Sequence, residues 1–124
     1  MSFCTAITCM DGRIQLPVNN YLREKFGDNY VDTITEAGPV GIISAGENKY
    51  IIEGILKRLQ ISVNNHGSDN IALVAHHDCA GNPVPFEEQI AHLKKSLLFI
   101  KSAYPGQRVI GLWVNENWEV EEID

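Results

Sequence analysis

Apolar residues follow two alternating periods along this chain. Short apolar runs rich in β-branched residues, bounded by polar residues or glycine, predict strands at 3–9, 30–38, 70–77 and 108–114. Between these runs, apolar residues recur at steps of three and four, which is typical of one buried helix face. This second period predicts helices at 16–27, 47–67 and 85–106. The chain therefore alternates between strand and helix along its whole length.

This alternation predicts the α/β fold class with a mostly parallel, four-stranded sheet. Right-handed crossovers between parallel strands place helices on both faces of the sheet. The run at 70–77 is almost entirely apolar, as expected for a strand buried on both faces. Residues 115–120 can turn back as a short antiparallel edge strand. With 124 residues and no repeat or linker, the chain is expected to be a single domain, 1–124.

Composition and charge narrow the range of partners. The chain is 44% hydrophobic, which is enough for one core, and its formal net charge is -6. An acidic balance argues against nucleic acid and against an anionic membrane surface as partners. No apolar run approaches the ~20 residues of a membrane span. No Lys or Arg precedes the first apolar run, which argues against a secretory signal and predicts a cytoplasmic protein.

Polar, chemically active residues follow two of the predicted strands. The stretch "CTAITCMDGRI" places Cys9, Asp11 and Arg13 at every second position where the first strand ends. The stretch "LVAHHDCAGNP" places His76 and Cys79 three residues apart where the third strand runs into a loop. Ligands in parallel α/β folds bind at the carboxyl ends of the strands, so both groups are expected in one site.

Thiolates and imidazoles are ligands that suit zinc. Cys9, His76 and Cys79 would supply three protein ligands and leave one position open, which is the pattern of a catalytic zinc site. Cys4 is five residues before Cys9, about 16 Å along an extended strand, and is expected to be a thiol of the core. Cys4 is thus not a candidate ligand.

A shared zinc also constrains the order of the strands. Zinc–sulfur bonds are ~2.3 Å long, and neighbouring strands are ~4.8 Å apart. The first and third strands are therefore expected side by side. The second strand then lies outside the first, which gives the order 2-1-3-4 with the metal site at the switch point.

In this chain order, Cys9-Met10-Asp11-Gly12-Arg13 and His76-His77-Asp78-Cys79 resemble the motifs of the β-class carbonic anhydrases. The segment "TEAGPV" is similar to that family's Arg-Asn-Ala-Gly segment only at Ala37 and Gly38. The resemblance runs from about residue 3 to residue 114. It implies Zn2+ held by the three ligands named above, with Asp11 and Arg13 paired beside them.

The resemblance also implies the chemistry: reversible hydration of carbon dioxide to bicarbonate by a zinc-bound hydroxide. Zinc lowers the pKa of its bound water to ~7. Asp11 would accept a hydrogen bond from the hydroxide, and a bidentate pair with Arg13 would keep Asp11 off the metal. His77 is a conceivable proton shuttle. β-class sites lie near subunit interfaces, which implies a homodimer or higher homo-oligomer.

Simpler interpretations remain open for each feature. Cys9 and Cys79 could be ordinary buried thiols, and Asp11–Arg13 a structural ion pair. A redox pair is disfavoured because there is no Cys-x-x-Cys and no helix is expected directly after Cys9. His77 could be a surface residue, and Asp78 is expected to cap the loop that follows it. The glycines of "GPVGIISAG" do not have the spacing of a phosphate-binding loop.

Two other functions share these residues. One is a zinc hydrolase of a related small substrate, such as carbonyl sulfide or carbon disulfide. The other is a non-catalytic metal-binding relative, which the replacement of the family's Arg and Asn by Thr35 and Glu36 favours. The Asp11–Arg13 pair favours an enzyme, because a purely structural zinc site does not need it.

Overall fold

The computed structural model describes residues 2–123. The elements follow in the order β1 (Phe3–Cys9), α1 (Gly12–Phe26), β2 (Tyr30–Glu36), α2 (Pro39–Ala45), α3 (Lys49–Asn64), β3 (Asn70–His76), α4 (Phe86–Ala103), β4 (Arg108–Val114) and β5 (Val120–Ile123). The sheet has five strands in the order β2-β1-β3-β4-β5, of which β5 alone is antiparallel to its neighbour. The predicted fold class and the order 2-1-3-4 are confirmed.

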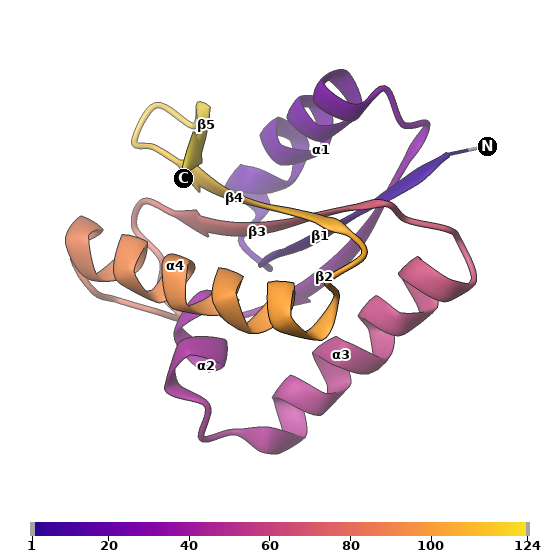
Figure 1. Cartoon of the computed structure of the whole chain (residues 1–124). Helices are drawn as coiled ribbons and strands as arrows, with labels where there is room; N and C mark the ends of the chain where they lie inside the picture. Colours follow the sequence, from indigo (N-terminus) through magenta and orange to yellow (C-terminus); the bar gives the residue numbers. More distant parts are fainter. Residues whose placement is uncertain (1, 124) are drawn as a thin grey trace.

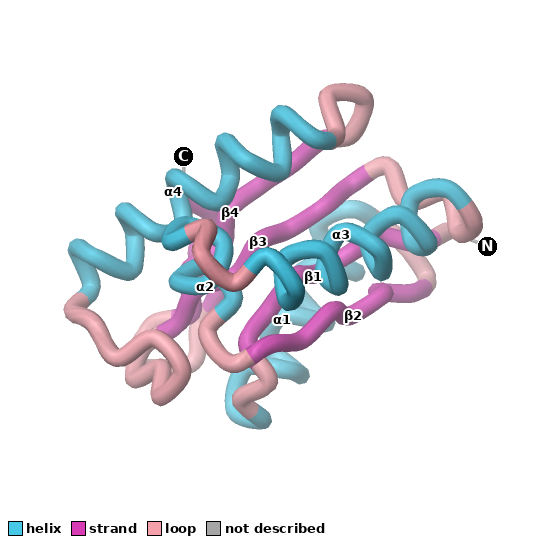
Figure 2. Tube along the Cα trace, turned by 90° about the horizontal axis from the view of Figure 1, so that it is seen from below, coloured by secondary structure: helices cyan, strands magenta, loops and turns pink. Residues whose placement is uncertain are grey.

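Helices cover the two faces of the sheet unequally (Figure 1). Helix α1 packs on one face, where Leu22 joins Cys4, Ala72 and Leu112 in a buried cluster. Helices α2, α3 and α4 cover the other face, as the view from below shows (Figure 2). Their apolar side chains form a second buried cluster with those of the strands, including Val40, Ile7, Leu59, Leu73 and Leu93. None of the helices within residues 2–123 has the length and apolar character needed to cross a membrane.

The two central strands determine where the chemistry gathers. Strand β1 pairs in parallel with β3 in the register Thr5 with Ile71 and Ile7 with Leu73. Both strands are buried on both faces after their first residue. A one-residue slip would turn every side chain of a strand to the opposite face, so burial on both faces fixes this register. The ends of both strands, at Cys9 and His76, therefore lie at the same edge of the sheet (Figure 2).

Apart from small shifts of element ends, the structure differs from the sequence analysis in three places. Helix α1 begins at Gly12 rather than at residue 16, because the Asp11 carboxylate accepts a hydrogen bond from the Arg13 backbone N–H and caps the helix. Pro17 lies inside the helix and does not begin it. The expectation that no helix follows Cys9 directly is therefore wrong. The positive end of α1 favours negative charge next to the site.

The second difference is α2, for which the pattern predicts no element. Its seven residues are too few to show helical periodicity, and Gly38 and Gly46 flank it in the left-handed conformation. The third is the C-terminal edge: residues 115–119 form the turn, and the antiparallel strand is β5, which pairs Val114 with Val120.

Close backbone packing fixes the loop that follows β3 against the segment that follows β2. A Cβ atom on Gly81 would clash with the carbonyl carbon of Ala37, and one on Gly41 would lie 2.7 Å from the Asn82 side chain. Asn82 is itself tied to α4, because Gln89 donates a hydrogen bond of 2.8 Å to its carbonyl oxygen. The loop that carries Cys79 is thus held by glycines on both sides of the contact.

The substitution Gly81→Ala should lower the free energy of unfolding by roughly 1–3 kcal/mol, because the added methyl group meets backbone atoms that cannot move aside easily. Gly106→Ala is the matched control, since nothing lies within 4 Å of its added Cβ. Urea unfolding of the two variants measures the difference. Equal stabilities would show that the loop contact at Ala37 is not tight.

Candidate metal centre

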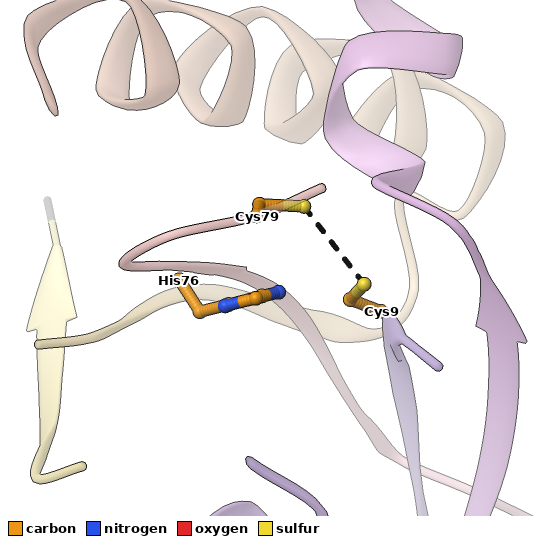
Figure 3. Close-up of side chains that lie close together, drawn as sticks. All are labelled: Cys9, His76 and Cys79. Carbon is orange, nitrogen blue, oxygen red and sulfur yellow. Dashed lines mark hydrogen bonds between the residues drawn. The ribbon is translucent and has the colours of Figure 1, made fainter. Parts of the chain in front are cut away.

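Three side chains from two strand ends converge at the carboxyl edge of the sheet (Figure 3). Cys9 is the last residue of β1, His76 is the last residue of β3, and Cys79 lies in the loop after β3. Their ligand atoms all lie within 4.8 Å of one another. The three residues are 4%, 1% and 5% exposed, respectively. The structure thus brings together all three of the ligands expected from the sequence.

The separation of the two sulfur atoms fits a shared metal. Cys9 Sγ lies 3.9 Å from Cys79 Sγ, and both cysteines are free. Two sulfurs bound at ~2.3 Å to a tetrahedral zinc would be ~3.8 Å apart. The thiols are therefore spaced as ligands of one ion rather than as a disulfide, whose sulfurs are ~2.05 Å apart.

The histidine presents one nitrogen to the cluster. His76 Nδ1 lies 2.7 Å from the carbonyl oxygen of His77, so Nδ1 carries the proton and donates it in this hydrogen bond. In the neutral imidazole, His76 Nε2 is then the unprotonated acceptor, and it is buried without a hydrogen-bond partner among the described residues. An unsatisfied buried polar atom costs ~1–3 kcal/mol. A bound metal ion would satisfy it, so the donor set fits the metal that the sequence predicts.

The charge balance of the two thiols also favours a cation. The hydrogen bond from Cys79 lowers the pKa of Cys9, with help from the backbone N–H groups of Gly38 and Asp11. The same pairing with Cys9 raises the pKa of Cys79, and burial raises it further. Without a cation the two thiols cannot both ionise, because two thiolates this close repel each other. A divalent ion would allow both thiols to ionise.

Asp11 and Arg13 form a pair directly beside this cluster. Arg13 Nη2 donates to Asp11 Oδ2 at 2.7 Å, and Arg13 Nε lies within hydrogen-bond distance of both carboxylate oxygens. Hydrogen bonds from the Arg13 side chain lower the pKa of Asp11 to about 2. No carboxylate in the described part of the chain belongs to the three-residue ligand group. Arg13 therefore holds Asp11 as an anion next to the site.

The comparisons with known proteins agree with this geometry. The whole chain, residues 1–124, matches the family model described as "Putative carbonic anhydrase". The chain belongs to this family. No curated protein matches the chain.

Solved structures show which carbonic anhydrase fold the chain shares. A carbonic anhydrase from Glaciozyma antarctica is 19% identical, with 97% of this chain and 81% of that chain covered and a TM-score of 0.62. The β-carbonic anhydrase CcaA is 13% identical, with 100% and 81% covered and a TM-score of 0.62. A tetrameric β-carbonic anhydrase from Sordaria macrospora is 13% identical, with 97% and 79% covered and a TM-score of 0.57. The chain thus belongs to the carbonic anhydrase family and shares the fold of these β-carbonic anhydrases, as the resemblance implied.

Two contacts at this carbonic anhydrase-like site were not expected from the sequence. Asp78 was expected to cap its own loop, but its carboxylate accepts from Arg13 Nη1 at 3.2 Å and its carbonyl oxygen accepts from Arg13 Nη2 at 3.1 Å. The indole ring of Trp118 covers the guanidinium, with Arg13 Cζ 4.5 Å from the ring centroid. Asp78 could have been suspected from its place between the ligands His76 and Cys79. Nothing in the sequence pattern pointed to Trp118.

The remaining candidates lie outside the ligand group. His77 is exposed, and its ring stands edge-on to Trp118 at a centroid distance of 6.4 Å. Cys4 is buried near the start of β1, where burial raises its pKa to about 12. The expectation that Cys4 is a core thiol is consistent with this placement.

Arg13→Ala should raise the pKa of Asp11 from about 2 toward its ordinary value near 3.8, because the guanidinium that stabilises the carboxylate is removed. Since the folded-state pKa is depressed, the stability that the pair contributes is present above pH ~3.8 and is lost as pH falls through ~2. Carbon-detected NMR titration of the Asp11 carboxyl in metal-free protein measures the shift, with Arg23→Ala as the control on the same helix. An unchanged Asp11 midpoint in Arg13→Ala would contradict the pairing.

Proposed function

We propose that this protein is a zinc lyase that hydrates carbon dioxide reversibly to bicarbonate. The observation that carries the proposal is the Cys9–His76–Cys79 ligand group next to a carboxylate held by Arg13. A structural zinc site usually has four protein ligands, whereas a catalytic site has three and an open position. Membership of the carbonic anhydrase family supports the same reaction.

Zinc at this site would lower the pKa of a coordinated water to ~7 and so supply a nucleophile for carbon dioxide at neutral pH. The protein's own contribution begins with His76, whose Nδ1–H donates to the His77 carbonyl and directs Nε2 toward the two sulfurs. Burial of the three ligands keeps bulk water from competing for the metal.

Asp11 and Arg13 would then orient the reaction. Asp11 accepts a hydrogen bond from the attacking oxygen and directs its lone pair toward carbon dioxide. Three N–H groups of Arg13, namely the backbone N–H, Nε and Nη2, donate to the Asp11 carboxylate. A carboxylate has about four acceptor sites, so Asp11 keeps capacity for that hydrogen bond. Held by Arg13, Asp11 stays off the metal and leaves the fourth position open.

A cavity beside the site supports a small substrate. It has a volume of about 320 Å³ and is lined by His76, His77, Phe86, Gln89 and Trp113, among others. The ring of Phe86 packs edge-on against that of Trp113, with centroids 4.9 Å apart, so part of the wall is aromatic. Such a wall suits a small apolar molecule such as carbon dioxide or its sulfur analogues.

Self-association is part of the proposal. Strand β2 is an edge strand of the sheet, and its first residue, Tyr30, is 49% exposed. An exposed edge strand presents unpaired backbone groups that a second copy can pair with. The tetrameric β-carbonic anhydrases from Sordaria macrospora, which share this fold, support a homo-oligomer.

Protein purified without chelator should bind about one zinc per chain, because the three ligands are preformed and His76 Nε2 lacks another partner. Cys79→Ser should weaken zinc binding strongly, whereas Cys4→Ser removes a buried thiol away from the site and should not. Elemental analysis and competition with a chromophoric chelator measure both. Equal zinc affinities of wild type and Cys79→Ser would refute the ligand assignment.

Arg13→Ala should reduce carbon dioxide hydration by ~100-fold or more, a transition-state loss of ~2.7 kcal/mol, while zinc stays bound. The reason is that Asp11, once released, can occupy the open position on the metal. Asp11→Ala should also lose activity but cannot close the site, so cobalt-substituted forms of the two variants should differ in visible spectrum.

Stopped-flow hydration assays on zinc-loaded protein measure the loss, with Arg23→Ala as the control. Full activity of Arg13→Ala would refute the role given to this pair. Wild type that binds zinc but hydrates neither carbon dioxide nor its sulfur analogues would favour the non-catalytic, metal-binding alternative.

A further inference from the structure

Arg13 is held on its edge and on one face by groups from three parts of the chain. Its edge donates to Asp11 and to Asp78, which come from the start of α1 and from the loop after β3. Its face lies against Trp118, which belongs to the turn between β4 and β5. The faces of a guanidinium cannot form hydrogen bonds, so an aromatic ring covers one without competing for the donors at the edge.

The turn that carries Trp118 is built to direct the indole. The Asn115 side-chain oxygen accepts hydrogen bonds from the backbone N–H groups of Asn117 and Glu119, at 2.9 and 3.1 Å. The backbone N–H of Trp118 donates to the Asn115 carbonyl oxygen at 2.9 Å. The strands on either side pair at Val114 and Val120, which anchors both ends of the turn.

The backbone of Trp118 is strained. Its φ is 60°, a left-handed conformation that bulky residues rarely adopt. Such conformations persist only where the surrounding structure determines them, and they concentrate at functional sites. In this case the surrounding hydrogen bonds of Asn115 maintain the conformation, and the resulting direction of the side chain brings the ring over Arg13.

We propose that Trp118 is a positioning residue for the reaction. Its indole restrains the Arg13 guanidinium, whose side chain is 45% exposed, in the orientation that holds the Asp11 carboxylate. Trp118 acts through Arg13 and does not belong to the ligand group. The catalytic part of this inference rests on the proposed function, whereas the restraint on Arg13 does not.

The restraint can be measured without metal or substrate. In 15N-labelled, metal-free protein, the heteronuclear NOE of the Arg13 Nε–Hε group reports how ordered the guanidinium is. In Trp118→Ala this value should fall toward that of the urea-unfolded protein. In Trp118→Phe, which keeps an aromatic face, it should stay close to wild type. Glu116→Ala changes an exposed residue of the same turn and is the matched control.

The same variants, loaded with zinc, test the catalytic consequence. Trp118→Ala should lose about tenfold in hydration rate, and Trp118→Phe should recover most of it. Circular dichroism confirms that each variant is folded. An Arg13 NOE unchanged by Trp118→Ala would overturn the restraint, and lost order with an unchanged rate would overturn the positioning role. If wild type itself does not hydrate carbon dioxide, the proposed function fails, and the NOE of Trp118→Ala still decides whether Trp118 holds Arg13.

Discussion

The parallel pairing of β1 with β3 is the constraint on which the site depends. Cys9 and His76 each end a strand, and the pairing of Ile7 with Leu73 places both ends at one edge of the sheet. Because both strands are buried on both faces, core packing fixes their register, and no contact between the ligands themselves is needed to align them. The relative position of Cys9 and His76 is therefore a consequence of the hydrophobic core.

The position of the third candidate ligand, Cys79, depends on a different kind of packing. Cys79 lies in a loop, where no ladder of backbone hydrogen bonds determines its position. Gly81 allows that loop to approach Ala37, and Asn82 connects it to Gln89 on α4. The loop is thus held between the segment that follows β2 and helix α4. This explains how a loop residue can lie 3.9 Å, sulfur to sulfur, from a strand residue.

Much of this arrangement follows from the sequence, and the exceptions have physical causes. Strand positions were predictable from short apolar runs. Their order was predictable because a metal shared between the ends of the first and third strands requires these strands to be neighbours. The start of α1 was not, because it depends on the hydrogen bond by which the Asp11 carboxylate caps the helix. The proximity of Cys9, His76 and Cys79 was predictable from motifs at strand ends. The contact between Trp118 and Arg13 was not, because it depends on the left-handed turn conformation of Trp118.

The central claim is that Cys9, His76 and Cys79 together hold one zinc ion. X-ray absorption spectroscopy at the zinc edge of the loaded protein tests it most directly, since it counts ligands by element and distance. Coordination by these three residues predicts two sulfur atoms at ~2.3 Å and a histidine nitrogen at ~2.0 Å. It also predicts that one sulfur disappears from the shell in Cys79→Ser. A shell of nitrogen and oxygen atoms alone in the wild-type protein would contradict zinc coordination by Cys9 and Cys79.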